Sequence, residues 1–182
     1  MLEESGNYIG GRNVPAASDE RLDVFSPATF YTSYPALGAP AEALLVAVYS
    51  PDNPLPPLVR EAVRMRIAVA NDCLVCRGAR LMPELGEAFY DNIGAFRDHP
   101  ELYGPEIRAA VEFAELFATD HLAIDETHFA RLSDFFSDEE VAALGVSCAY
   151  FSAFGRLTRV MMLDHACPIE PPVRPEPIAA PG

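Results

Sequence analysis

Apolar side chains recur at three- and four-residue spacing through much of the region between residues 40 and 165. Such spacing places them on one side of an α-helix. The clearest case runs from Leu58 to Ala70, directly after Pro56 and Pro57, and proline suits the first turn of a helix. The pattern predicts a helix here, with an apolar side made by Val59, Ala62, Val63, Ile67 and Ala70.

Further helices are predicted downstream. Residues 105–119 are amphipathic with a helical period. Asp125 is placed to cap the short helix that follows it. Ser137 and Glu140 have the spacing of a capping box, which opens a long apolar helix reaching about Leu163. Because no convincing alternating strand pattern is found, we predict an all-α bundle of about six or seven helices.

The two ends of the chain differ from its middle in composition. Residues 1–40 and 168–182 are rich in Pro, Gly, Ser and Ala, and the last stretch holds six of the 17 prolines. Such a tail favours extended backbone. We therefore divide the chain into an N-terminal arm at 1–40, a helical domain at 41–167 and a Pro-rich tail at 168–182. The arm contains four aromatic residues that are expected to pack on the protein's own core or on a neighbouring subunit: Phe25, Phe30, Tyr31 and Tyr34.

Charge excludes some classes of partner. A length of 182 residues suits a single domain, and the formal net charge is −14. A surface this acidic repels phosphate backbones and anionic lipid, so neither nucleic acid nor a membrane is an expected partner. The first eleven residues lack the pattern of a secretory signal, and no uninterrupted apolar stretch reaches the ~18 residues that span a bilayer. A cytoplasmic protein is expected.

Cys73 and Cys76 are the sharpest chemical feature, because two intervening residues allow their sulfurs to meet and form a disulfide. Asn71 and Asp72 indicate a turn, and we expect Asp72 to cap a helix that begins at Cys73 and runs towards Met82. A cysteine in the first turn of a helix is held closer to its reactive thiolate form. In a reducing compartment, a close cysteine pair is typical of a redox or a metal site.

Other interpretations of the cysteines remain open at this point. The pair could be two buried structural cysteines, or half of a zinc site completed by His165 and Cys167. Cys148 lies within the long apolar helix and is interpreted as a small buried hydrophobe.

Residues 61–80, which carry Glu61 twelve residues before Cys73, resemble the active-site stretch of the AhpD-like, carboxymuconolactone decarboxylase superfamily. The resemblance extends through segments near 106–119 and 124–144, and so covers about residues 40–165. It points to the CxxC-containing, peroxidase-related branch and to its helical bundle.

The resemblance implies a role for each matching residue. Cys76 becomes the attacking thiol, Cys73 the resolving thiol and Glu61 the base of a proton relay. The implied activity is that of a peroxidase or disulfide reductase of peroxiredoxin type. It acts on a peroxide or disulfide substrate and draws electrons from a partner dithiol protein, so no bound cofactor is required. A homo-oligomer, a dimer or trimer, is also expected.

Arg80 departs from the family pattern, which has histidine four residues after the second cysteine. Arginine stays protonated and cannot shuttle a proton, although it can stabilise a thiolate. General acid–base assistance is worth about 10²–10⁴-fold in rate. We therefore expect a slow enzyme, with a non-catalytic ligand-binding or scaffold protein as the alternative. Arg64 is placed to pair with Glu61 on the same helix. A histidine folded close to Cys76 could replace the relay, from among His99, His121, His128 and His165.

Overall fold

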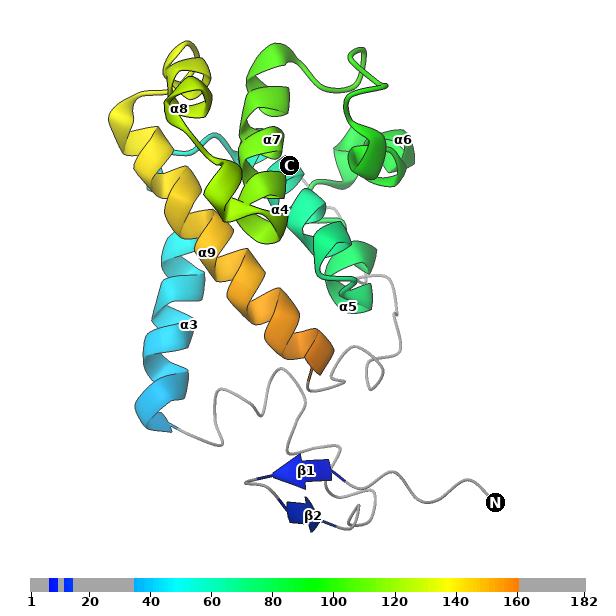
Figure 1. Ribbon diagram of the computed structural model, residues 1–182, viewed down its shortest axis with the longest axis vertical. Helices are drawn as coiled ribbons and strands as arrows, with labels where there is room; N and C mark the ends of the chain where they lie inside the picture. Colours follow the sequence, from blue (N-terminus) through cyan, green and yellow to red (C-terminus); the bar gives the residue numbers. More distant parts are fainter. Residues whose placement is uncertain (1–6, 10–11, 15–34, 161–182) are drawn as a thin grey trace, which may run out of the picture.

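The computed structural model describes residues 7–9, 12–14 and 35–160, and seven α-helices make up most of this part (Figure 1). The predicted all-α class is confirmed. The helices are α3 (Pro35–Tyr49), α4 (Pro57–Ala70), α5 (Leu74–Gly78), α6 (Gly86–Asp91), α7 (Pro105–Thr119), α8 (Glu126–Ser133) and α9 (Asp138–Val160). Short 3-10 turns are η1 (Pro83–Leu85), η2 (Ile93–Ala95) and η3 (His121–Ala123).

The first helix and the N-terminal residues differ in detail from the sequence prediction. Helix α3 begins at Pro35, within the range assigned to the arm. A small antiparallel hairpin of β1 (Asn7–Ile9) and β2 (Arg12–Val14) lies in a region where no strand pattern was found, because three-residue strands are too short to show an alternating period. The proposed tail at 168–182 lies outside the described residues.

The helix starts follow from local chemistry. Pro57 and Pro105 occupy the first turns of α4 and α7, where the missing N–H costs nothing. The Asp125 carboxylate accepts the N–H groups of Thr127 and His128 at the start of α8. At the start of α9, the Ser137 N–H and hydroxyl both donate to Glu140, and the Glu140 N–H donates back to the Ser137 hydroxyl. The predicted caps of α8 and α9 are confirmed.

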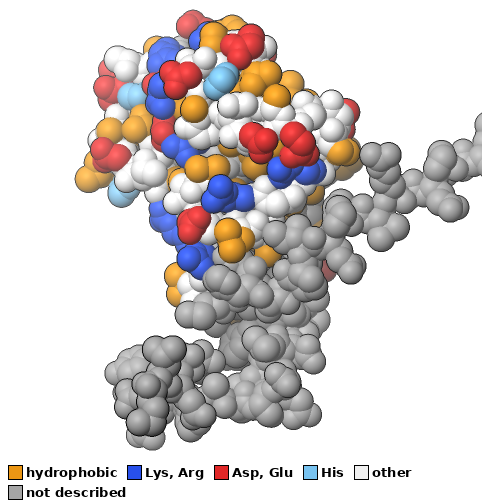
Figure 2. Space-filling model, turned by 90° about the vertical axis from the view of Figure 1, so that its right-hand side faces the viewer, with side chains coloured by type: hydrophobic (Ala, Val, Ile, Leu, Met, Phe, Trp, Pro, Cys, Tyr) orange, Lys and Arg blue, Asp and Glu red, His pale blue; other side chains and the backbone are white. Residues whose placement is uncertain are grey.

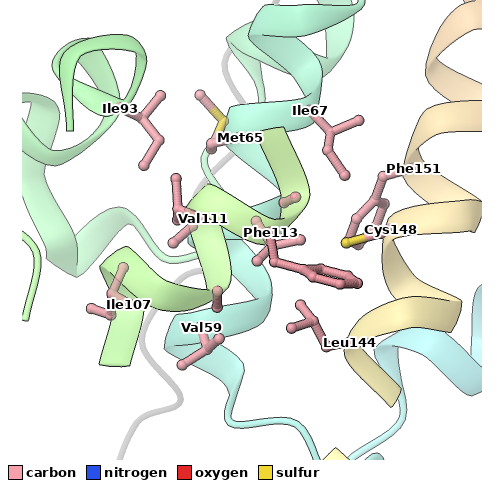
Figure 3. Close-up of a cluster of buried hydrophobic side chains, with 14 of the residues drawn as sticks. Val59, Met65, Ile67, Ile93, Ile107, Val111, Phe113, Leu144, Cys148 and Phe151 are labelled. Carbon is pink, nitrogen blue, oxygen red and sulfur yellow. The ribbon is translucent and has the colours of Figure 1, made fainter. Parts of the chain in front are cut away.

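Helix α4 is the centre of the bundle and packs against α7, α9 and α5. It is buried on nearly every side, including at Glu61, Arg64 and Arg66. Figure 3 shows side chains of α4, α7 and α9 directed toward one another, with Ile67 and Cys148 among them. Cys148 is fully buried, and burial raises the pKa of its thiol, so its interpretation as a small core residue is confirmed.

Helix α9 is long and apolar enough, by length and composition alone, to cross a bilayer. One side of it packs into the core through Leu144, Cys148 and Phe151. A core helix can have the same length and apolar composition as a helix that crosses a bilayer. It contacts α3, and in Figure 1 the two helices approach each other near the C-terminal end of α3 and then diverge.

A ladder of ion pairs joins α4, α7, α8 and the segment after η2. Glu115 of α7 pairs with Arg66 of α4 and with Arg97, the latter at 2.6 Å. Glu112, one turn earlier, pairs with Arg97 at 3.6 Å and with Arg131 of α8 at 2.5 Å. On the face shown in Figure 2, acidic and arginine side chains are interspersed in this way over the helical part.

Candidate functional site

Cys73 and Cys76 are joined by a disulfide. Cys73 is completely buried, whereas Cys76 is partly exposed and lines a cavity. The cysteines therefore differ in access, and a molecule in the cavity meets Cys76 first.

The turn before the cysteines corrects two details of the sequence prediction. Asp72 does not cap the helix, because its φ of 49° lies in the left-handed region. Cys73 is the cap residue instead, and its sulfur accepts the N–H of Cys76 at 3.3 Å. Helix α5 ends at Gly78 and does not reach Met82.

Asn71 fixes this turn to α9. Its amide nitrogen donates to the carbonyl oxygens of Phe151 and Ser152 at 3.2 and 3.4 Å, and its oxygen accepts from Nε of Arg156 at 3.1 Å. Gly155 allows the close approach, because a Cβ there would lie 2.5 Å from the Asn71 amide nitrogen. The position of the cysteine pair is thus set by a helix about eighty residues away in sequence.

Glu61 and Arg64 form a buried bidentate ion pair beneath α5. Nε and Nη2 of Arg64 lie 2.7 Å from the two carboxylate oxygens, and both side chains are at most 6% exposed. The Leu81 N–H also donates to Glu61 at 3.2 Å. Burial lowers the pKa of Arg64, but the hydrogen bond and charge of Glu61 outweigh it and raise that pKa overall. The predicted pairing of Arg64 with Glu61 is present, and both side chains are buried.

Arg64 also reaches the end of α5. Its Nη1 donates to the Cys76 carbonyl oxygen at 2.6 Å, and its Nη2 donates to that of Ala79 at 2.9 Å. Carbonyl groups at the end of a helix lack partners within that helix. Arg64 satisfies two of them and so connects Glu61 to the backbone of the cysteine motif.

Arg80 lies in a different environment. Its guanidinium contacts Glu87 at 2.9 Å, donates to the Arg77 carbonyl oxygen at 2.6 Å and lies 4.4 Å from the centre of the Tyr90 ring. Arg80 is absent from the lining of the cavity that contains Cys76.

The cavity beside Cys76 has a volume of about 240 Å³ and mostly apolar walls. Four aromatic side chains from α3 and α9 line it: Tyr49, Tyr150, Phe151 and Phe154. Arg64 and Thr158 are among its few polar contributors. Burial raises the pKa of Tyr49 to about 12, so its phenol stays protonated at neutral pH.

No described histidine lines this cavity. His99 contacts Glu101, His128 contacts Asp125, and His121 is exposed. Within the described ranges, no group of three or more His, Cys, Asp or Glu side chains is arranged to hold a metal ion. His165 and Cys167, which the zinc interpretation requires, lie outside those ranges.

The arrangement defines an all-α protein with a disulfide at the wall of a small aromatic cavity, and the fold is that of the AhpD-like proteins. A peroxidase-related protein from Ralstonia eutropha with an AhpD core is 23% identical, with a TM-score of 0.64 and 72% of each chain covered. A second peroxidase-related protein, from Silicibacter, is 17% identical, with a TM-score of 0.65, 74% of this chain and 72% of that one covered.

Two other solved structures share the fold. An Agrobacterium tumefaciens protein described as a putative antioxidant defence protein AhpD is 20% identical, with a TM-score of 0.63, 73% of this chain and 92% of that one covered. A debrominase in its apo form is 18% identical, with a TM-score of 0.62, 74% of this chain and 73% of that one covered. Neither a family model nor a curated protein matches the sequence. The resemblance seen in the sequence is confirmed at the level of the fold.

Sequence reasoning missed the aromatic cavity wall and the link from Arg64 to α5. Tyr49 and the α9 aromatics have no chemical motif, and only packing brings them to Cys76. The three-residue spacing of Glu61 and Arg64 indicated their pair but not the contacts to Cys76 and Ala79.

Proposed function

We propose that this protein is a thiol-dependent oxidoreductase, a peroxidase or disulfide reductase, that acts through Cys76 and Cys73. The observation that carries the proposal is the unequal access of a cysteine pair able to form a disulfide: Cys76 lines the cavity and Cys73 lies buried behind it. Proteins of the same fold described as peroxidase-related support the same class of chemistry.

The proposed reaction starts from the reduced pair. The Cys76 thiolate attacks the terminal oxygen of a hydroperoxide, the O–O bond breaks, and the alkoxide leaves as an alcohol after taking up a proton. The Cys73 thiol then attacks the Cys76 sulfenic acid, releasing water and forming the disulfide. With a disulfide substrate, the Cys76 thiolate attacks one sulfur, the substrate S–S bond breaks, and the first thiol leaves. Cys73 then attacks the Cys76 sulfur of the mixed disulfide, releasing the second thiol. A partner dithiol returns two electrons, and no bound cofactor takes part.

Glu61 and Arg80 have more limited proposed roles. Both oxygens of Glu61 are engaged by Arg64, and Leu81 adds a further hydrogen bond, so a relay through this carboxylate requires the ion pair to loosen. Arg80 carries its charge beside Glu87. A slow reaction is therefore expected.

The test uses reduced wild-type protein with cumene hydroperoxide or a small aromatic disulfide, and dihydrolipoamide as the electron donor. Wild type should turn over. Cys76→Ser should be inactive, and Cys73→Ser should stop after one equivalent, with Cys76 trapped as sulfenic acid or mixed disulfide. Equal loss of the first step in both variants would contradict the assigned order.

The alternative is a non-catalytic protein that binds a small apolar ligand, and the aromatic cavity wall is the observation that favours it. Saturable binding of a small aromatic compound, without any oxidation of Cys76 by either substrate, would support it over the oxidoreductase.

A cytoplasmic homodimer or homotrimer completes the proposal. Leu37 and Val46 of α3 are more than 60% exposed, which suits contact with another subunit. Light scattering that shows a stable monomer of about the 19.8 kDa chain mass would contradict it.

A further inference from the structure

Two arginines lie near the cysteine motif, and their surroundings differ. The Arg64 guanidinium lies 2.6 Å from the Cys76 carbonyl oxygen and lines the same cavity as the Cys76 side chain. The Arg80 guanidinium is bound to Glu87 and is not part of the cavity wall. Arg64 therefore shares the cavity with Cys76, whereas Arg80 does not.

Only one of the two charges of the Glu61–Arg64 ion pair, that of Arg64, lines the cavity. Arg64 faces the cavity and the end of α5, whereas Glu61 is 3% exposed and absent from the cavity lining. The pair thus presents its positive end toward Cys76. The burial of the pair reduces the solvent screening that weakens surface charges.

We propose that Arg64, held in place by Glu61, is the positioning residue that stabilises the Cys76 thiolate in the reduced protein. It takes over the electrostatic part of activation in a chain that has Arg80 where a relay histidine is expected. Glu61 then serves to orient Arg64. This inference rests on the proposed thiol chemistry and names the group that tunes it.

The other titratable and charged groups around Cys76 come from several elements. Arg77, the next residue, is half exposed and paired with Asp72 at 3.3 Å. Burial raises the pKa of both Tyr49 and Tyr90 to about 12, so they carry no charge at neutral pH. Asp72 also contacts Arg159 of α9 at 3.6 Å. Other groups nearby are Tyr150 of α9, the Cys73 thiol, and Arg80 with its partner Glu87.

The expected size of the effect follows from general thiol chemistry. A nearby opposite charge shifts a pKa by about 1–3 units. Where the pH lies well below both pKa values, raising the Cys76 pKa by one unit on removal of Arg64 lowers the thiolate fraction about tenfold. Because nucleophilicity rises with pKa, with a Brønsted coefficient of about 0.4–0.5, the rate in that pH range falls only about threefold, and the limiting rate at high pH rises about threefold.

The experiment measures Cys76 alkylation by iodoacetamide against pH in the reduced full-length protein, with the modified peptide quantified by mass spectrometry. Wild type should titrate below the ~8.5 of a free thiol. Arg64→Gln should raise that pKa by at least about one unit. Compared with wild type, this variant should alkylate more slowly at pH values below both pKa values and faster at high pH, where the thiol is fully ionised. Arg66→Gln is the matched control, because Arg66 is a buried arginine of the same helix that pairs with Glu115, away from the cavity.

Two further variants exclude other causes. Arg64→Gln frees the Glu61 carboxylate, so the Glu61→Gln/Arg64→Gln double variant tests the loss of the cation without a new negative charge, and it avoids an unpaired buried charge if the single variant does not fold. It should also raise the Cys76 pKa. Arg80→Gln tests whether the positive charge of Arg80 stabilises the thiolate instead. It should shift the Cys76 pKa by less than half as much as Arg64→Gln does.

A folded double variant with the wild-type Cys76 pKa would overturn the inference, as would an Arg80→Gln shift as large as that of Arg64→Gln. A low Cys76 pKa that depends on Arg64, without any turnover of peroxide or disulfide, would contradict the proposed function but not this inference. Turnover with a Cys76 pKa that is independent of Arg64 would contradict this inference but not the proposed function.

Discussion

Gly145 and Gly155 lie on the same helix, α9, but we expect opposite results when each is replaced by alanine. A Cβ at Gly145 would meet nothing within 4 Å, whereas a Cβ at Gly155 would lie 2.5 Å from the amide nitrogen of Asn71. Asn71 has a short side chain that is 8% exposed and held by three hydrogen bonds to α9, so it cannot move away without losing them.

The magnitudes separate the two variants. Alanine in place of glycine inside a helix stabilises by about 0.8–1 kcal/mol. Gly145→Ala should keep this gain, and Tm should rise by roughly 2–4 °C for a chain of this size. In Gly155→Ala the same gain is opposed by the loss of buried hydrogen bonds at Asn71, about 2–4 kcal/mol in total. We expect a net destabilisation of about 1–3 kcal/mol, or roughly 2–12 °C in Tm.

The assay is thermal and urea unfolding of both variants followed by circular dichroism, with the disulfide intact. Asn71→Ala provides the second arm, because Gly155→Ala should become neutral or stabilising in that background. Equal stabilisation by Gly145→Ala and Gly155→Ala in the wild-type background would refute the reasoning. So would additive effects of Asn71→Ala and Gly155→Ala.

Three further predictions follow from the environments of single groups. Cys148 is buried and its thiol pKa is raised, so iodoacetamide should leave it unmodified at pH values where Cys76 of the reduced, folded protein reacts. It should react after denaturation, and labelling of Cys148 in the folded protein, detected by mass spectrometry, would contradict its burial. The Thr127 hydroxyl and His128 lower the pKa of Asp125 to about 2, so its contribution to stability is complete above its ordinary pKa and is lost as the pH falls toward 2. The Tm difference between wild type and Asp125→Ala should therefore narrow over that range, and a constant difference would contradict the assignment. Burial raises the pKa of three tyrosines to about 12, so stability should decline as the pH rises from about 10 toward 12, with late ionisation in an ultraviolet titration of Tyr49, Tyr90 and Tyr103.

Helix periodicity and local caps made most of the fold predictable. The helix at 105–119 matches α7 at both ends, because its starting proline and its amphipathic pattern are local signals. The caps at Asp125 and Ser137 were predictable for the same reason. The short length of α5 was not, because the left-handed Asp72 and the end at Gly78 depend on contacts with α9 and Arg64.

The candidate site was predictable only in part. The spacing of Glu61, Cys73 and Cys76 is visible in sequence, and the structure brings the three into one region through Arg64. The direction of the Arg80 side chain depends on Glu87 and Tyr90, which no pattern around residue 80 reveals. The cavity wall joins α3 to α9, and such long-range packing leaves no motif in either segment.

The ion-pair ladder makes the attachment of α8 dependent on ionic strength. Arg97 and Arg131 are each 53% exposed, and both bind Glu112 at the outer end of the ladder, where mobile ions reach them. The inner pair of Arg66 with Glu115 is at most 19% exposed and is shielded from those ions. Added salt should therefore loosen α8 from α7 before it affects the contact between α4 and α7, and amide exchange in α8 should rise at salt concentrations that leave the helix carrying Glu61 and Arg64 unchanged.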